Sequence, residues 1–182
     1  MIMKYEMKNC RDGSAPVYKT TVEISEKDGV LNFVFDAENS ELYCCKRGYN
    51  NIHSLGDVCE ILIGTSEKRN LYYEIEVNPE GDLMIARMTN RGVDANGKPV
   101  LDIDFVSEPF IDARCEKTET GYRARLSFKK SEILTGDGEV YFNAYRIETD
   151  GGEMEKHLFA LIPTMQGKFH VPSKFVYLKD YT

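Results

Sequence analysis

Residues 71–88 read LYYEIEVNPEGDLMIARM, and this stretch decides the fold class. Ile75 and Val77 alternate with Glu74 and Glu76, which is the period of two that is typical of a β-strand with one face toward a core. The Asn-Pro-Glu-Gly-Asp segment that follows has the composition of a tight turn, and a second apolar run comes directly after it. The stretch therefore predicts an antiparallel hairpin with its glutamates on a solvated face.

The same alternation recurs along the chain between glycine-containing turns, which is typical of an all-β protein. About ten strands are expected to form a two-sheet antiparallel β-sandwich, jelly-roll-like and with little helix. One helical turn is expected at 131–134. A length of 182 residues predicts a single domain over 1–182. The expected strands are 18–24, 30–36, 58–63, 71–78, 83–88, 100–106, 110–116, 122–129, 140–147 and 174–178.

The charge balance argues against several classes of partner. Lys and Arg total 23 against 30 Asp and Glu, a formal net charge of -7. So acidic a chain is a poor match for nucleic acid or an anionic membrane, and no apolar run approaches the roughly 18 residues of a membrane span. We expect a neutral ligand, no nucleic acid and no membrane. The charged first residues predict no secretory signal in the chain as given, so it is either intracellular or cut from a longer protein.

Five cysteines without a repeated spacing predict reduced thiols rather than disulfides. No CxxC pair is present and the three histidines are far apart, so no metal ion or other cofactor is expected. A metal site assembled from residues distant in the sequence remains open. Nucleophilic catalysis and nucleotide binding have no support, because the chain lacks GxSxG, GxGxxG and P-loop motifs.

Three glutamates are the candidates for chemistry: Glu74 and Glu76 on one strand face, and Glu60 on the strand expected at 58–63. Paired carboxylates, one protonated and one ionised, are what a glycosidase needs. Fixed carboxylates also bind the hydroxyl groups of a polar ligand without any reaction. A third interpretation is a solvated sheet face whose charges are balanced by arginines. The arginines available for this are Arg87, Arg125 and Arg146.

Two arginines and one loop are further candidates. Arg87 and Arg146 each share a strand face with apolar residues, so each guanidinium is expected to be partly buried and paired. Residues 159–172 read FALIPTMQGKFHVP and predict a long irregular loop. Such a loop forms the rim of a binding site or covers a sheet end, with Phe169 and Val171 as plugs.

The order of several segments resembles the family-nine carbohydrate-binding modules, which belong to a DOMON-like β-sandwich superfamily. The resemblance covers residue 30 to the end. It implies a β-sandwich that binds polysaccharide of the xylan or cellulose kind, as an accessory of glycoside hydrolases or as a stand-alone protein. The segments are GDVCEILI at 56–63, YYEIEVNPEG at 72–81, YFNAYRI at 141–147, IPT at 162–164 and FHVPSKF at 169–175.

In that family two tryptophans sandwich a terminal sugar ring, and this chain contains no tryptophan. The resemblance places His53 near the first tryptophan position and Leu161 at the second. Aliphatic side chains replace an aromatic platform only in part, because the ring face is what desolvates the axial C–H groups of a sugar. Aromatic residues that could substitute are Tyr43, Tyr49, Tyr72, Tyr145 and Phe159.

Glu60 and Arg87 stand where the family has its acidic and basic sugar contacts, so the resemblance implies that both bind sugar hydroxyls. Calcium is not expected, because the chain has no D-x-D-x-D loop. The sequence thus predicts a non-catalytic module that binds a sugar or oligosaccharide end in a cleft, with residues from 49–55 and 157–169 beside the ring. The expected ligand-binding residues are Glu60, Arg87, His53, Tyr72, Glu74, Arg146, Phe159 and Leu161.

Two alternatives stay open. The first is a structural or protein-interaction domain that has lost sugar binding together with its tryptophans. The second, less favoured, is a glycoside hydrolase that uses Glu60 with Glu74 or Glu76.

Overall fold

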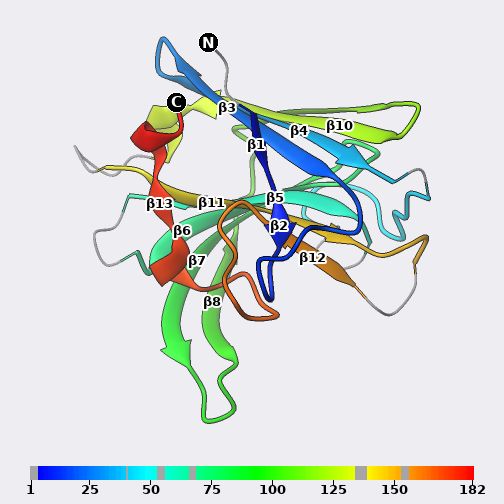
Figure 1. The fold of residues 1–182 in the computed structure, drawn as a ribbon. Coiled ribbons are helices and arrows are strands. Elements are labelled where there is room, and N and C mark those ends of the chain that lie inside the picture. The colour runs from blue at the N-terminus through cyan, green and yellow to red at the C-terminus, as the bar shows by residue number, and fades with distance from the viewer. Residues whose placement is uncertain (1–3, 40, 53–55, 66–68, 134–138, 153–155) are drawn as a thin grey trace.

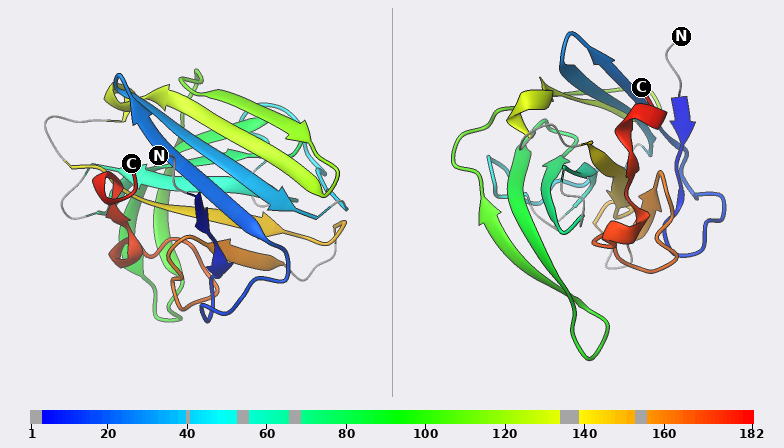
Figure 2. Two further views of the ribbon diagram at one scale, coloured as in Figure 1. Left: turned by 45° about the horizontal axis from the view of Figure 1, so that its top comes forward. Right: turned by 90° about the vertical axis from the view of Figure 1, so that its left-hand side faces the viewer.

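The structure, a computed structural model, describes residues 4–39, 41–52, 56–65, 69–133, 139–152 and 156–182. Two antiparallel sheets pack face to face, as Figures 1 and 2 show. The five-stranded sheet has the order β1 (Lys4–Glu6), β3 (Thr20–Lys27), β4 (Val30–Glu38), β10 (Gly121–Lys129) and β9 (Asp112–Lys117). The predicted all-β sandwich is confirmed.

The second sheet has eight strands. Its order is β2 (Lys8–Asn9), β12 (His157–Ala160), β11 (Tyr141–Glu148), β5 (Val58–Gly64), β6 (Leu71–Val77), β7 (Leu83–Val93) and β8 (Pro99–Phe105), and β13 (Val176–Tyr177) also pairs with β11. Three short 3-10 turns complete the elements: η1 (Lys130–Glu132), η2 (Pro172–Lys174) and η3 (Leu178–Asp180). Within the described ranges, no helix is long and apolar enough to span a bilayer.

Most predicted strands are present with ends shifted by a few residues, and the differences lie near the chain ends. Strands β1 and β2 were not predicted, since they are three and two residues long and show no period. The expected strand at 174–178 is present only in part: Val176 and Tyr177 pair as β13, between two 3-10 turns. The helical turn expected at 131–134 is observed as η1, and residues 134–138 lie outside the described part.

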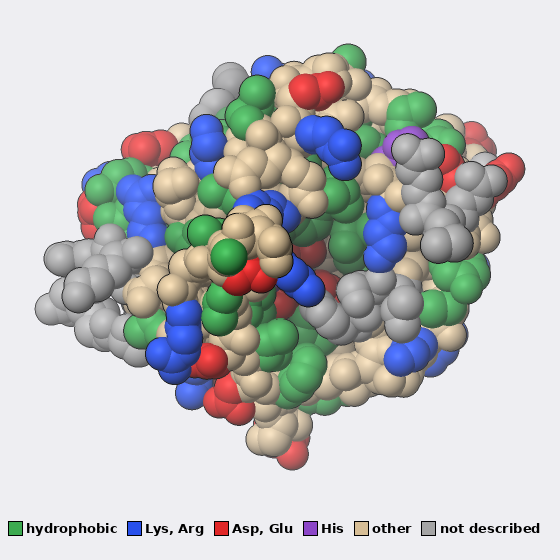
Figure 3. Space-filling view, turned by 90° about the horizontal axis from the view of Figure 1, so that it is seen from below, with side chains coloured by type: hydrophobic (Ala, Val, Ile, Leu, Met, Phe, Trp, Pro, Cys, Tyr) green, Lys and Arg blue, Asp and Glu red, His purple; other side chains and the backbone are tan. Residues whose placement is uncertain are grey.

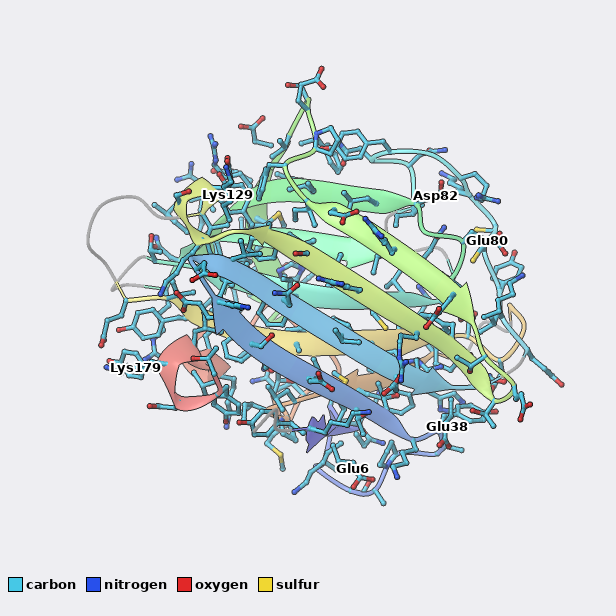
Figure 4. The ribbon with its side chains drawn as sticks, turned by 90° about the horizontal axis from the view of Figure 1, so that it is seen from above. Glu6, Glu38, Glu80, Asp82, Lys129 and Lys179 are labelled. Atoms are coloured by element: carbon cyan, nitrogen blue, oxygen red, sulfur yellow. The ribbon has the colours of Figure 1, made fainter. Side chains whose placement is uncertain are left out.

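The main core lies between the two sheets. Its side chains come from the inner faces of β4, β5, β10 and β11, and include Phe33, Phe35, Ile61, Leu126 and Phe142, all fully buried. In β10, Leu126 lies on the inner face, as the alternation of apolar and polar residues in this strand predicts. The outer face of the five-stranded sheet carries charge instead: the carboxylate of Asp36 lies 2.6 Å from both Lys4 Nζ and Arg123 Nε. Figure 4 looks down on this open polar face, with Glu38 at the end of β4.

The central strands of the eight-stranded sheet are buried on both faces, whereas β8 at its edge is largely exposed. Every residue of β5 and of β11 is buried, and a second apolar cluster covers the outer face, with Leu62, Met84 and Met88 among its members. The cover is segment 161–175, drawn in orange and red beneath the sheet in Figure 1; its Phe169 and Phe175 belong to this cluster. The predicted solvated face of residues 71–78 is therefore wrong, because a segment distant in the sequence lies over it.

A buried ion pair lies between the sheets. Arg146 and Glu148 form a salt bridge with both side chains fully buried. Arg146 also donates from Nη1 to Thr20 Oγ1 at 2.8 Å, and its guanidinium lies over the rings of Tyr122 and Phe159. The prediction that Arg146 is paired is confirmed. Because Arg146 lies inside the sandwich, its contacts stabilise the packing of the two sheets.

Replacing Arg146 by Ala is expected to lower the free energy of unfolding by about 3–5 kcal/mol, because the Glu148 carboxylate is left buried without its partner. The measurement is urea denaturation followed by circular dichroism. Arg123→Ala is the matched control: its ion pair with Asp36 is exposed and should contribute less than about 1 kcal/mol. Equal losses in the two variants would contradict the assignment.

Candidate functional site

A cleft of about 480 Å³ opens on the outer face of the eight-stranded sheet, which is within the usual size of a small-ligand site. We call it the acidic cleft. Its floor is Glu60, Glu74 and Glu76; its sides come from the 96–101 part of the β7–β8 hairpin, from Ile147 and Leu158, and from residues 167–170. Figure 3 shows this face: acidic side chains lie in the hollow, with hydrophobic side chains around them and lysine or arginine at the rim.

The strand register brings the three carboxylates together. Glu60 on β5 lies directly opposite Glu76 on β6, and Glu74 is two residues before Glu76 on the same face. One carboxylate oxygen from each lies within 4.8 Å of the others, although each residue is only 1–2% exposed. Like charges at opposed positions of a sheet destabilise it, and burial increases the cost. The cluster is therefore a cost to folding, as is typical of groups kept for function.

The electrostatics agree with this geometry. Burial, and then the neighbouring Glu74 and Glu76 carboxylates, raise the pKa of Glu60 well above its usual range. Glu60 Oε1 and Glu74 Oε2 are buried and accept no hydrogen bond from the described residues. Buried acceptors without a donor are rare in native proteins and call for an explanation.

The imidazole of His170 contacts the floor of the acidic cleft. Its Nε2 lies 3.4 Å from Glu74 Oε1, and its Nδ1 is 3.0 Å from the hydroxyl of Tyr72. Asn90 Nδ2 in turn donates to that hydroxyl at 3.4 Å. The chain of contacts fixes the imidazole with one nitrogen toward the carboxylates.

The cover over the sheet is held at both of its ends. Near its start, Cys10 Sγ and Thr164 Oγ1 are 3.1 Å apart. Further on, the Tyr145 hydroxyl donates to the carbonyl of Phe169 at 3.0 Å and the two rings stack at 4.3 Å. Lys168 Nζ donates to the carbonyl of Gly97 in the β7–β8 hairpin. These contacts join the two sides of the acidic cleft.

The structure brings together only part of the predicted site. Glu60 and Glu74 lie on the floor, and Tyr72 lies beside them through His170. Arg87 does not share this cleft: it pairs with Tyr73 across β6 and β7, on the opposite face from Glu74, and it is largely exposed. The expectation that Glu60 and Arg87 face one cleft is thus corrected.

Three other predicted residues lie elsewhere. Arg146 and Phe159 point into the space between the sheets, and Leu161 belongs to the same inner core. His53 lies outside the described residues. The expected irregular loop at 159–172 begins two residues later than predicted, because Phe159 and Ala160 belong to β12. The pairing of β12 with β11 turns the Phe159 ring inward.

The suggested aromatic substitutes do not line the acidic cleft, whose aromatic lining among the described residues is Phe169 and His170. Tyr145 and Tyr72 lie on the same sheet face but are buried, and the Tyr49 hydroxyl donates to the carbonyl of Val106. From the 157–169 segment, Leu158, Gly167, Lys168 and Phe169 line the cleft.

Several lining residues escape the sequence analysis. Lys98 and Leu101 come from a hairpin with no functional motif, and Lys168, Phe169 and His170 from the covering segment. The loop predicted at 159–172 contains Lys168, Phe169 and His170, but the sequence assigns a possible role, that of a plug, only to Phe169 among them. One sequence signal does place Arg87 and Glu74 on opposite faces of the sheet. Side chains alternate between the two faces along β6 and β7, and the turn between the strands sets which residues lie opposite each other.

The cover predicts a pattern of thiol reactivity. In the native protein Cys45, which is exposed, should react with iodoacetamide first. Cys10 under the cover and Cys59 between the sheets should be protected, because burial raises the pKa of both, that of Cys59 to about 12. Mass spectrometry of the peptides gives the order. Fast reaction of Cys10 with Cys59 still protected would show that the cover is open.

Comparisons with solved structures place this geometry in context. No protein-family model and no curated protein matches the sequence. A provisionally assigned carbohydrate-binding protein from Bacteroides uniformis aligns over 97% of this chain and 85% of its own, with 12% identity and a TM-score of 0.74.

A family-9 carbohydrate-binding module from Caldicellulosiruptor kristjanssonii in complex with glucose aligns over 95% of this chain and 82% of its own, with 14% identity and a TM-score of 0.57. The same module in complex with cellotriose aligns over 95% and 80%, with 14% identity and a TM-score of 0.58. At these identities the likeness concerns the backbone alone. The chain has the β-sandwich fold of the family-9 carbohydrate-binding modules.

Proposed function

We propose that the protein binds a saccharide in the acidic cleft and performs no covalent chemistry on it. The observation that carries this is the composition of the cleft: buried carboxylate acceptors on the floor and apolar walls around them. Support comes from the fold, whose solved neighbours include modules in complex with glucose and cellotriose.

The groups of the cleft suit a sugar. Hydroxyl groups of a ligand supply the donors that Glu60 Oε1 and Glu74 Oε2 lack, and a buried acceptor left without a donor is costly. Phe169, held by its stack on Tyr145, offers an aromatic edge to the C–H side of the ring, with Leu158 beside it. This arrangement takes the place of a tryptophan platform.

The carboxylates are poorly placed for hydrolysis. In a glycosidase two carboxyl groups flank the scissile bond from opposite sides, about 5 Å or more apart, and both reach the substrate. Here Glu60, Glu74 and Glu76 together form the floor of the acidic cleft and do not flank it from two sides. This supports binding over catalysis.

An interaction domain without sugar binding is the second candidate. It is favoured by the absence of tryptophan and by the small exposure of the three glutamates. A binding screen against mono- and oligosaccharides separates the two, because silence across the panel supports only the interaction domain.

Phe169→Ala is expected to weaken the best ligand of that screen about tenfold, since an aromatic contact contributes about 0.5–1.5 kcal/mol beyond its area. Calorimetry measures the affinity. Phe169→Leu keeps an apolar side chain without the ring, so its affinity should lie between those of the wild type and Phe169→Ala. Wild-type affinity in both variants would remove Phe169 from the site.

Glu74→Gln is expected to lower the affinity for the same sugar tenfold or more, because a hydrogen bond to a charged acceptor contributes about 1.5–3 kcal/mol. Two controls use the geometry. Arg87→Gln changes the opposite sheet face and Glu119→Gln an exposed turn between β9 and β10; both should bind like the wild type. A loss in Arg87→Gln that matches Glu74→Gln would place the ligand on the other face.

A further inference from the structure

We infer that Glu60, Glu74, Glu76 and His170 hold a divalent transition-metal ion at the floor of the acidic cleft. This goes beyond sugar binding and does not depend on it. Four side chains from two strands and the covering segment converge here, although they are far apart in the sequence.

The oxygens have the spacing of a single coordination sphere. Ligand atoms about 2.0–2.2 Å from one ion lie at most about 4.4 Å from each other, and the three carboxylate oxygens lie within 4.8 Å. Small side-chain movements close that difference. Glu60 and Glu74 are 1% and 2% exposed, so a bound ion would be largely shielded from solvent.

Two buried atoms point to a missing partner. Glu60 Oε1 and Glu74 Oε2 accept no hydrogen bond from any described residue. No described lysine or arginine forms an ion pair with either glutamate; Glu74 Oε1 instead lies 3.4 Å from Nε2 of the His170 imidazole. Lys168, at the rim, donates instead to the Gly97 carbonyl. A cation at the floor satisfies both oxygens at once and balances their charge.

His170 is already oriented as a metal ligand. Its Nε2 faces Glu74 at 3.4 Å while its Nδ1 contacts the Tyr72 hydroxyl at 3.0 Å. Metal-bound histidines almost always use the second ring nitrogen for such a hydrogen bond, which sets the tautomer and the ring angle. Asn90, bonded to the same hydroxyl, holds Tyr72 in place.

The donor set indicates the kind of metal. Carboxylates alone suit Mg²⁺ and Ca²⁺, whereas an added imidazole favours Mn²⁺, Fe²⁺ or Zn²⁺. Three carboxylates and one imidazole would leave positions open on an ion that prefers six ligands. Zn²⁺ should bind more tightly than Mn²⁺, in line with the general order of divalent affinities.

The test is direct metal binding without any sugar, so that its failure is distinct from a failure of the proposed function. The full chain is freed of metal with a chelator and titrated with Mn²⁺, and the free ion is followed by electron paramagnetic resonance. We expect one site per chain with micromolar affinity, displacement of Mn²⁺ by equimolar Zn²⁺, and much weaker competition by Mg²⁺.

The variants are matched. Glu60→Gln and His170→Gln should each weaken Mn²⁺ binding at least tenfold, whereas Glu119→Gln and His157→Gln should not change it. His157 is a suitable control because it is paired with Asp150 away from the cleft, at 2.7 Å. Circular dichroism establishes that each variant is folded. His170 lies partly at the surface, so His170→Gln still tests the site if Glu60→Gln is unstable.

Three results would overturn the inference. They are fewer than one bound ion per chain at millimolar Mn²⁺, equal affinity in His170→Gln and His157→Gln, and binding that Mg²⁺ abolishes as readily as Zn²⁺. The last would indicate a general attraction of cations to an acidic surface.

Discussion

The contact between segment 161–175 and the outer face of the eight-stranded sheet is the one on which the other features depend. It converts what would be a wet face into a second apolar cluster with Leu62 and Met84, and it buries Glu60 and Glu74 with it. Without this segment the carboxylates would be ordinary surface groups with full hydration. The raised pKa of Glu60 and the walls of the acidic cleft both follow from the same packing.

The two buried charge clusters of this protein are built differently. Arg146 and Glu148 pair between the sheets, with Thr20 as a further partner, so they fix how the two layers meet, although Arg146 Nε is buried without an acceptor among the described residues. Glu60 and Glu74 on the outer face are like charges instead, and their burial and mutual repulsion raise the pKa of Glu60. The first arrangement joins opposite charges, whereas the second would be stabilised by a cationic or hydrogen-bonding ligand. This difference is the physical reason to look for function at the second cluster and not at the first.

Local sequence patterns predict the strands well and the burial of their outer faces poorly. The alternation of Ile75 and Val77 with Glu74 and Glu76 correctly assigns inner and outer sides of β6. The alternation carries no information about a covering segment more than eighty residues away in the sequence. It therefore predicts a solvated outer face. Arg87 lies two residues after Ile85 on β7, so the two side chains share a face. Together with the register of the hairpin, this places Arg87 on the opposite face from Glu74. His170 could not have been assigned, because its role comes only from long-range packing.

The joining of the two chain ends has a consequence for biosynthesis. Strand β2 pairs with β12, and Cys10 contacts Thr164, 154 positions later. During translation β2 therefore has no partner strand until β12, about 150 residues later, has been made. Contacts of such high sequence separation form late and slowly. The acidic cleft is thus among the last parts to assemble, because a nascent chain that ends before residue 167 lacks one of its walls.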